Sequence, residues 1–336
     1  MKKLENSTSD VAGLLSLTLR WVIGWTYFSA FWRRLILDNK LIPEEAGYIG
    51  EKFNHFLPNA LGIKPIIEYL VSNPEALHIS MIVFTIVEAI VGLFLILGLF
   101  SRLMSIGVFG LAMGILLGSG WIGTTCLDEW QIGVLGVAGG FTLFLSGGGH
   151  YSLDNWMQKK QMRISSSKYF TILGSGPLQI PYLPQIVLAG SIGIFALTLF
   201  TNQYFHGGVY GTLHNKSVKP RIEIGEPVYS EGQLKFSVFR VEGADVYGSF
   251  LIGMELKDAA GVVIHALDQS DLSTMPEEQI QNYYVAKVKP GKHSLILPLG
   301  AKADIILNTG PLSPGNYQLR LLDISGAEWS KEVVIR

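Results

Sequence analysis

The sequence has little cysteine and little charge. A single cysteine in 336 residues excludes an internal disulfide, an iron–sulfur site held by cysteines alone and a cysteine-rich zinc site. Charged residues make up 16% of the chain, whereas a soluble globular protein has about 25%. This composition argues against an ordinary cytosolic enzyme. The formal net charge of −1 gives no electrostatic basis for binding nucleic acid.

Motifs for the common redox cofactors are also missing. The sequence has no GxGxxG after a predicted strand and no CxxCH, which are the patterns of dinucleotide binding and of haem attachment. Its histidines are not spaced in a strong metal-binding pattern. We therefore expect no bound flavin, haem, nicotinamide or metal.

Long apolar stretches are present instead. Hydrophobic residues make up 49% of the chain, and the mean hydropathy is +0.34. A bilayer core of about 30 Å needs roughly 20 apolar residues in a helix. We predict an α-helical membrane bundle of four spanning helices plus a fifth, over residues 11–32, 77–100, 103–119, 130–146 and 182–205. Small residues at four-residue spacing, Gly110 and Gly114 in the third stretch and Gly136 and Gly140 in the fourth, favour close helix packing.

The chain changes character near residue 204. After Lys219 the hydrophobic pattern has a period of two, and turn dipeptides such as Glu231-Gly232 separate nine short predicted strands, one of them Tyr283–Val288. Short strands at this spacing favour an all-β, immunoglobulin-like sandwich. We predict a four-helix transmembrane domain over 1–160, a cytoplasmic linker with the fifth helix over 161–205, and an extracytoplasmic β-sandwich over 206–336.

The distribution of basic residues predicts an orientation. The side that holds the N-terminus carries seven lysines and arginines in its short segments, against five on the other side. This weak positive-inside bias predicts a multi-pass protein of the cell (inner) membrane, with the N-terminus in the cytoplasm and the C-terminal domain on the periplasmic or extracytoplasmic side. Residues 33–77 are predicted to form short amphipathic helices at the membrane interface.

The loop over 120–130 is the most distinctive stretch. It joins two uncharged helices and contains Cys126, Asp128 and Glu129 between Trp121 and Trp130. One interpretation is a redox or nucleophilic thiol, since the thiolate is the reactive form. The other is a small packed side chain beside interfacial tryptophans. The two acids would raise the pKa of the thiol, so a reactive Cys126 needs cations from elsewhere.

Two further segments on the predicted Cys126 side supply donors. Trp32, Arg33 and Arg34 end the first helix, and an arginine pair can clamp a dianion; snorkelling at the membrane edge is the alternative. The glycine-rich junction between His206 and His214 can expose backbone N–H groups to an anion, or it is merely a flexible connection.

Two ionisable residues lie inside predicted spans. Arg20 is in the first and Glu88 in the second, both near mid-depth. Such residues are rare and are functional candidates by default. Glu88 either relays protons to a lipid-soluble reactant or forms a structural ion pair with Arg20.

The sequence resembles a known family. Arg20-Trp21, Gly24-Trp25 and Phe31-Trp32-Arg33-Arg34, with the block Gly120–Gln131, resemble DoxD within the DoxX-like group. Residues from about 180 onward, including Ser217-Val218-Lys219-Pro220, resemble DoxA. The resemblance implies a fused DoxD/DoxA protein of the thiosulfate:quinone oxidoreductase type. It would oxidise two thiosulfates to tetrathionate at the outer membrane surface and pass two electrons to a membrane quinone, which is its electron-accepting substrate.

With this resemblance, the candidate residues take roles. Cys126 is predicted to bond the sulfane sulfur of thiosulfate, while Asp128, Glu129 or Glu88 delivers protons to the quinone. The predicted substrate-binding residues are Arg33, Arg34, His206, His214, Trp32, Trp121, Trp130 and Arg20. A non-enzymatic membrane anchor or partner subunit and a sulfur-oxyanion transporter stay open as alternatives, as does a homodimer.

Overall fold

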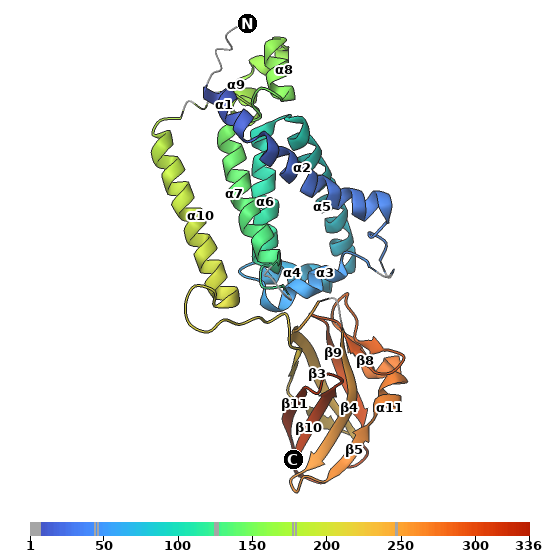
Figure 1. Cartoon of the computed structure of the whole chain (residues 1–336). Coiled ribbons are helices and arrows are strands. Elements are labelled where there is room, and N and C mark those ends of the chain that lie inside the picture. The colour runs from blue at the N-terminus through green and yellow to red at the C-terminus, as the bar shows by residue number, and fades with distance from the viewer. Residues whose placement is uncertain are drawn as a thin grey trace. The chain divides into compact units, whose positions relative to one another are not determined.

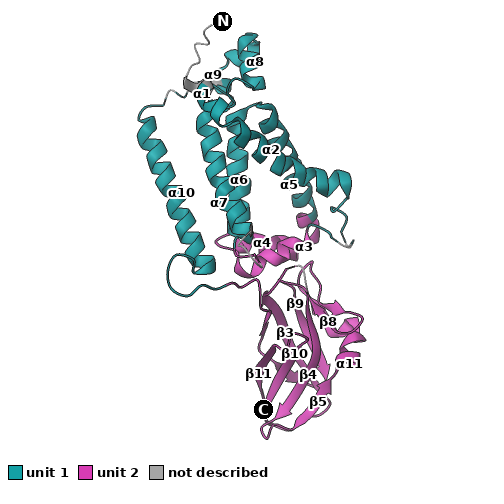
Figure 2. Cartoon of the chain, in the orientation of Figure 1, with its two compact units in different colours: residues 1–49, 78–120, 128–214 teal, residues 50–77, 121–127, 215–336 magenta. Residues whose placement is uncertain are grey.

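The computed structural model describes residues 8–43, 45, 47–123, 128–176, 178, 180–245 and 248–336 (Figure 1). The chain divides into two compact units, each of which is discontinuous in sequence (Figure 2). Unit 1 consists of residues 1–49, 78–120 and 128–214, and unit 2 of residues 50–77, 121–127 and 215–336. The three consecutive parts predicted from the sequence, over residues 1–160, 161–205 and 206–336, stay a prediction.

Unit 1 is helical. Helices lie in all five predicted apolar stretches, but the first stretch is divided by Ser16 and ends in a π-helix. Among the described residues, α5, α6 and α10 are long and apolar enough to cross a membrane; that α2 and α7 also cross stays a prediction. The elements are α1 (Thr8–Leu15), α2 (Leu17–Phe31), the π-helix η1 (Trp32–Leu37), α5 (Pro74–Leu97), α6 (Ser101–Ser119), α7 (Asp128–Ser146), α8 (Leu153–Lys159), η3 (Arg163–Ser166), α9 (Lys168–Leu173) and α10 (Leu183–His206).

Glycines allow α6 and α7 to pack closely. A Cβ on Gly136 would lie 2.6 Å from Ala112 Cβ, and one on Gly140 would lie 2.9 Å from Phe109 N, so neither position accepts a side chain without movement. The predicted contact through these two glycines is confirmed. Gly110 and Gly114 differ, because a Cβ on either would meet nothing within 4 Å.

The core of unit 1 is apolar. Tyr27 of α2 packs with residues of α5, α6 and α7 in one buried cluster, which includes Leu95, Val108 and Leu143. The four helices thus bury a common apolar face, as the packing of a bundle requires.

Unit 2 contains an all-β domain of two antiparallel sheets. One sheet has the order β1-β3-β9-β6, with β2 on β3, and the other β11-β10-β4-β8-β7, with β5 on β4. The all-β prediction is confirmed, and an immunoglobulin-like fold stays a prediction. The elements are β1 (Arg221–Ile224), β2 (Val228–Ser230), β3 (Gln233–Glu242), β4 (Ser249–Asp258), β5 (Val263–Leu267), α11 (Gln269–Ser273), η4 (Glu277–Gln279), β6 (Ile280–Asn282), β7 (Lys289–Pro290), β8 (Leu295–Leu297), β9 (Lys302–Asn308), β10 (Gly315–Asp323) and β11 (Glu328–Ile335).

The inward faces of both sheets form one core. Strand β3 alternates buried and more exposed side chains along most of its length, which is the period of a strand with one face packed. Phe236 of β3, Leu256 of β4 and Ile305 of β9 are each at most 1% exposed and lie in the same buried cluster.

A helical segment from the first quarter of the chain belongs to unit 2. Residues 50–77 contain α3 (Glu51–Phe56), the 3₁₀ turn η2 (Leu57–Asn59) and α4 (Lys64–Ser72). Short helices are thus present in the predicted 33–77 stretch, while their place at the membrane interface stays a prediction. Leu57, Ile67 and Val71 form a buried cluster against which Phe239 and Tyr284 pack. The apolar side of this segment is therefore covered by the β domain.

The strand predicted over Tyr283–Val288 is wrong. Most of this segment is irregular, and its polar groups bond to the helical segment: Val285 N donates to Val71 O at 3.1 Å, and Ala286 N donates to Asn54 Oδ1 at 3.1 Å. Because these donors are satisfied by residues 50–77, they do not join a sheet ladder.

Candidate functional site

An ion pair inside unit 1 joins the π-helix η1 to α5. Arg34 lies 2.5 Å from Glu88, between Nη1 and Oε2. The same Arg34 nitrogen donates to Thr85 Oγ1 at 3.1 Å, and the guanidinium lies over the Phe84 ring. The Arg34 and Glu88 side chains are only 13% and 6% exposed. The structure thus brings together two predicted site residues, and Thr85 shares their network.

Arg20 does not pair with Glu88, so that structural alternative is wrong. Arg20 is 1% exposed, and its guanidinium donates to the backbone oxygens of Gly148 and Tyr151. These carbonyls lie in the connection between α7 and α8, outside either helix, so they need partners from elsewhere. Arg20 therefore stabilises the turn between α7 and α8, and Arg34 neutralises Glu88.

Arg33 and Trp32 lie at the surface of unit 1. Trp32 is 41% exposed, and Arg33 is also exposed, with Nε donating to Ser29 O at 3.3 Å. No acid in the described part of the chain pairs with Arg33. Of the two predicted arginines, Arg33 is thus the one whose terminal nitrogens are open to an anion.

His206 is the buried residue at the end of α10. It is 0% exposed, and its Nε2 lies 2.9 Å from Gly120 O at the end of α6. Since a carbonyl only accepts, Nε2 carries a proton. Its Nδ1 is buried and has no hydrogen-bond partner among the described residues. Five residues earlier in α10, the buried Thr201 accepts from Trp130 Nε1 at 3.0 Å.

Much of the backbone of the junction is hydrogen-bonded within the junction itself, and its role as an anion cradle stays a prediction. Gly207 has φ +64° and Gly211 φ +82°, as expected for glycines in sharp turns. The Gln203 side chain, however, accepts from Val209 N and Tyr210 N. The backbone N–H groups of Gly207, Gly208 and His214 bond to carbonyls of residues 203, 202 and 206. These five donors are occupied within the junction, and the His214 side chain is exposed.

The segment that leads to Cys126 is anchored within unit 2. Trp121 is 0% exposed and donates from Nε1 to Phe56 O at 3.3 Å. Ser217 Oγ bonds both backbone groups of Gly123, and Asn215 Nδ2 also donates to Gly123 O, at 2.6 Å. The chain therefore enters the loop from a fixed position.

The central residues of this loop have no described geometry. Cys126 and the side chain of Asp128 lie outside the described residues. Glu129, in the first turn of α7, is half-buried, a position where the helix dipole favours a carboxylate. The roles of Cys126, Asp128 and Glu129 stay predictions.

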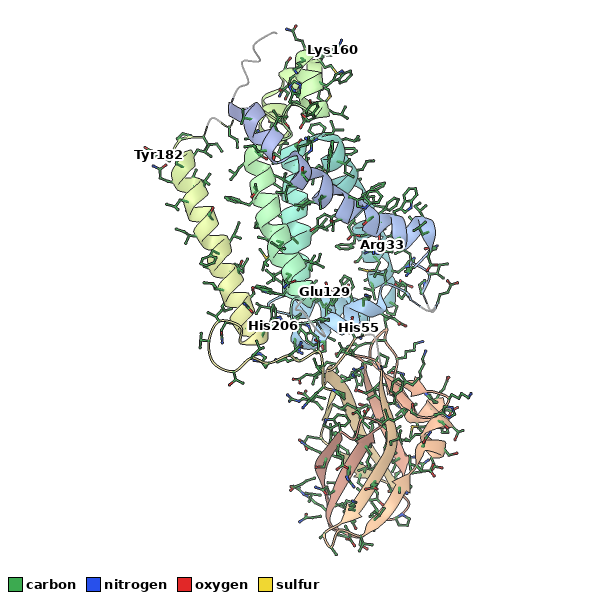
Figure 3. All side chains as sticks on the ribbon, viewed as in Figure 1. Arg33, His55, Glu129, Lys160, Tyr182 and His206 are labelled. Atoms are coloured by element: carbon green, nitrogen blue, oxygen red, sulfur yellow. The ribbon has the colours of Figure 1, made fainter. Side chains whose placement is uncertain are left out.

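The structure does not join the arginine pair to the histidines. No hydrogen bond or ion pair links Arg33 or Arg34 to His206 or His214 in the part of the chain that the structure describes. Figure 3 shows Arg33 and His206 on different sides of the bundle in unit 1, at the end of α2 and at the end of α10. Among the described residues, no contact therefore brings the predicted substrate-binding arginines and histidines together.

Two polar residues of these networks were missed from the sequence. Thr85 lies three residues before Glu88, so both are on one face of α5, and this spacing could have marked it. Ser217 lies in the quoted Ser217-Val218-Lys219-Pro220 stretch, but its partner Gly123 is 94 positions away, and no local pattern indicates that contact. Among the described residues, no group of three or more histidines, cysteines and acids is placed to hold a metal ion.

Comparison with known families identifies two consecutive segments of the sequence. Residues 15–188 match the family described as TQO small subunit DoxD, where TQO stands for thiosulfate:quinone oxidoreductase. Residues 205–332 match the family described as TQO small subunit DoxA. The first match covers slightly more than half of the chain, and the two follow one another with a short gap. The chain therefore belongs to the DoxD family and is a fused DoxD/DoxA protein of the thiosulfate:quinone oxidoreductase type.

Proposed function

We propose that this chain is a membrane thiosulfate:quinone oxidoreductase. The reaction is 2 S₂O₃²⁻ + quinone + 2 H⁺ → S₄O₆²⁻ + quinol, in which the two sulfane sulfurs are joined and the quinone takes up two electrons. The observation that carries the proposal is the tandem match to DoxD and DoxA in a single chain. The apolar helices α5, α6 and α10 suit a reaction whose oxidant is dissolved in lipid.

The proposed first half-reaction forms a bond to Cys126. A Cys126 thiolate, thiosulfate, quinone and two protons give the Cys126 S-thiosulfonate and quinol. The second thiosulfate then attacks the sulfur bonded to Cys126, tetrathionate leaves, and the thiolate is restored. Glu129 and Asp128 follow Cys126 closely in sequence, and with Glu88 they are the proposed proton carriers.

Arg33 is the proposed first contact for thiosulfate. Its exposed guanidinium, which is paired with no described acid, can offset the two charges of the substrate. Arg34 is buried against Glu88 and His206 lies on a different side of the bundle from Arg33, so we do not place them with Arg33 on one thiosulfate. Their substrate-binding roles, and that of His214, stay predictions. A site at the outer membrane surface would allow a water-soluble dianion to react with a lipid-soluble acceptor.

The direct test is turnover by the purified full-length chain in detergent. With thiosulfate and a short-chain quinone, we expect one tetrathionate and one quinol for every two thiosulfates consumed. Mixtures lacking either reactant are the controls. An absence of quinol formation would overturn the proposed function and favour an anchor or partner subunit, whereas thiosulfate uptake into liposomes without quinone would favour a transporter.

Cys126→Ser tests the covalent step separately. We expect loss of turnover by at least about 100-fold, with the protein still inserted in the membrane. Near-wild-type rates in this variant would exclude the covalent intermediate while leaving the overall reaction intact.

The role of Arg33 is tested in the same assay. Arg33→Ala should raise the KM for thiosulfate more than it changes the KM for quinone, and Arg33→Lys should recover part of the loss.

A further inference from the structure

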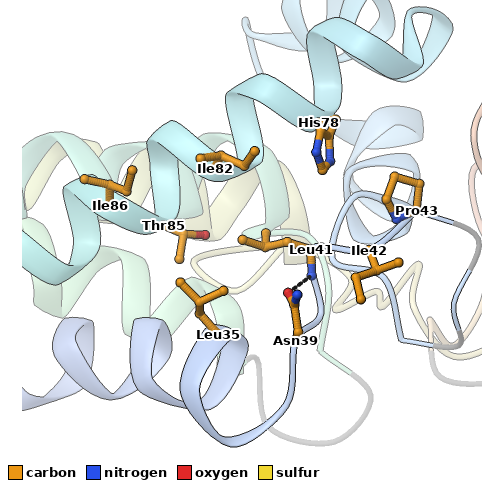
Figure 4. Close-up of a pocket in the computed structure, with 9 residues that line it drawn as sticks. All are labelled: Leu35, Asn39, Leu41, Ile42, Pro43, His78, Ile82, Thr85 and Ile86. Carbon is orange, nitrogen blue, oxygen red and sulfur yellow. Dashed lines mark hydrogen bonds between the residues drawn. The ribbon is translucent and has the colours of Figure 1, made fainter.

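A groove in unit 1 adjoins the Arg34–Glu88 pair. It has a volume of about 410 Å³ and lies between the first half of α5 and residues 35–43, within the range of about 300–1,000 Å³ typical of small-molecule sites. Figure 4 shows His78, Ile82 and Thr85 on α5 facing Leu41 and the segment around it. All the residues that line the groove belong to unit 1.

The walls of the groove are mainly apolar. Ile82 and Ile86 contribute from α5, and Leu35 and Ile42 contribute from the opposite segment. Ile86 is 49% exposed and Ile42 40% exposed, so apolar side chains continue from the groove onto the outer surface of a helix long enough to cross a membrane. An apolar chain attached to a ligand in the groove could therefore leave directly into lipid.

Three polar side chains interrupt this apolar lining. His78 Nδ1 is buried without a hydrogen-bond partner among the described residues. Thr85 Oγ1 accepts from Arg34, so its hydroxyl still carries one hydrogen to donate. Asn39 Oδ1 accepts from Leu41 N at 3.2 Å, so the oxygen of this amide is already used in a hydrogen bond to the backbone two residues later. A buried nitrogen without a hydrogen-bond partner is costly, and because His78 lines the groove, a ring rotation that turns Nδ1 toward a ligand there would satisfy it.

The ion pair lies directly behind Thr85. Arg34 Nη1 contacts both Thr85 Oγ1 and Glu88 Oε2, so a positive charge lies next to the polar end of the groove and a carboxylate lies one turn further along α5. A ligand that gains negative charge on reduction would be stabilised by the Arg34 charge, and the Glu88 carboxylate could take up protons and pass them to the ligand.

We propose that this groove binds the head group of the membrane quinone, with His78 and Thr85 hydrogen-bonded to its carbonyl oxygens and its apolar tail passing Ile86 into the bilayer. The proposal rests on the proposed function and assigns its electron acceptor to a particular place in the fold. On reduction, the quinone oxygens accept two electrons and two protons; the electrons come from thiosulfate, as in the overall reaction.

The test measures quinone binding without thiosulfate, so it does not depend on turnover. Equilibrium binding of radiolabelled decylubiquinone and menaquinone-1 to the full-length protein in detergent is compared for wild type, Ile82→Trp, His78→Ala and Val83→Trp. Ile82→Trp fills the groove and should raise the Kd at least tenfold, and His78→Ala should raise it at least threefold. Val83 is the next residue, 54% exposed and outside the groove, so Val83→Trp should stay within twofold.

A second measurement uses the wild-type protein and so avoids any folding defect of the variants. A photoreactive azidoquinone should label peptides within residues 35–43 and 78–86, and excess decylubiquinone should suppress the labelling. Labelling elsewhere, for example along α10, or unchanged binding in folded Ile82→Trp, would overturn the proposal.

The outcomes separate the groove assignment from the proposed function. If quinone binds in the groove but thiosulfate never reduces it, the groove assignment stands and the proposed function fails. If thiosulfate reduces quinone equally well in Ile82→Trp, the groove assignment fails and the proposed function stands.

Discussion

At the scale of single residues, the Arg34–Glu88 ion pair has the clearest energetic consequence. Both side chains are largely withdrawn from solvent, and removal of one partner leaves a buried charge without compensation, at about 3–5 kcal/mol. We expect Arg34→Met or Glu88→Leu alone to lower the stability of the full-length protein by an amount of this order. The double variant should be more stable than either single variant, because it leaves no unpaired charge.

Thermal unfolding of the detergent-solubilised chain measures this effect. Arg33→Met is the matched control, since Arg33 is exposed and pairs with no described acid; its effect should stay within about 0.5 kcal/mol. Single variants no less stable than Arg33→Met, or additive effects in the double variant, would show that the pair contributes nothing to the fold.

His55 of α3 predicts a pH dependence of stability. Burial lowers the pKa of His55 to about 4, and the nearby Asp245 carboxylate raises it only in part. The pKa in the unfolded chain is about 6.5, so between these values the unfolded state binds more protons than the folded state. The contribution of His55 is therefore complete above about pH 6.5 and is lost as the pH falls toward 4, by up to about 3 kcal/mol.

Unfolding midpoints at pH 7 and pH 4.5 test this prediction. His55→Gln cannot titrate, so its loss of stability at pH 4.5 should be smaller than that of the wild type. His293→Gln is the control, because His293 is exposed in the same unit and should leave the pH profile unchanged. Equal profiles for wild type and His55→Gln would assign the acid sensitivity to other groups.

At the scale of elements, the apolar stretches predicted the long helices well. The stretch over 182–205 corresponds to α10 (Leu183–His206), and that over 103–119 to α6 (Ser101–Ser119), because long runs without charge leave helix as the structure that satisfies the backbone. The break at Ser16 was not predictable in this way. A Cβ on Gly13 would lie 2.2 Å from Gly149 Cα, and Ser16 Oγ bonds Ser146 Oγ at 2.8 Å, so the break belongs to a contact distant in sequence.

The error over Tyr283–Val288 has the same origin. Its period-two pattern is that of a half-buried strand, but Asn54 and Val71, more than 200 positions earlier, take its backbone N–H groups. The candidate site shows again that local sequence patterns do not identify contacts between residues distant in sequence. The positions of Arg20 and Glu88 inside apolar stretches marked them as unusual charges. Only the tertiary structure determines that Arg34 is the partner of Glu88 and that backbone carbonyls are the partners of Arg20.

At the scale of the whole molecule, the discontinuity of unit 2 matters most. Residues 50–77 lie mostly before α5 in the sequence and include its first four residues. Their apolar side chains nevertheless pack with the β domain. Asn54 of α3 is 0% exposed and donates to Gly300 O at 3.2 Å. Asn59 Nδ2 donates to Val241 O, and its Oδ1 accepts from Lys216 Nζ. The DoxA-like part is thus held by non-covalent contacts to a segment of the DoxD-like part, in addition to the chain connection after α10.

These contacts predict that the chain survives a cut at its junction. A protease site placed between Tyr210 and Leu213, which are 74% and 70% exposed, would separate the β domain covalently from α10. We expect the two fragments to co-purify in mild detergent and to separate only on denaturation. Ile67→Asp places a charge in the buried cluster and should release the β fragment after cleavage. Ile66→Asp, at a 62% exposed position next to it, should not. Release of the β fragment from the cleaved parent chain would contradict the prediction, because it would mean that only the peptide connection holds the DoxA-like part to the helical segment at residues 50–77.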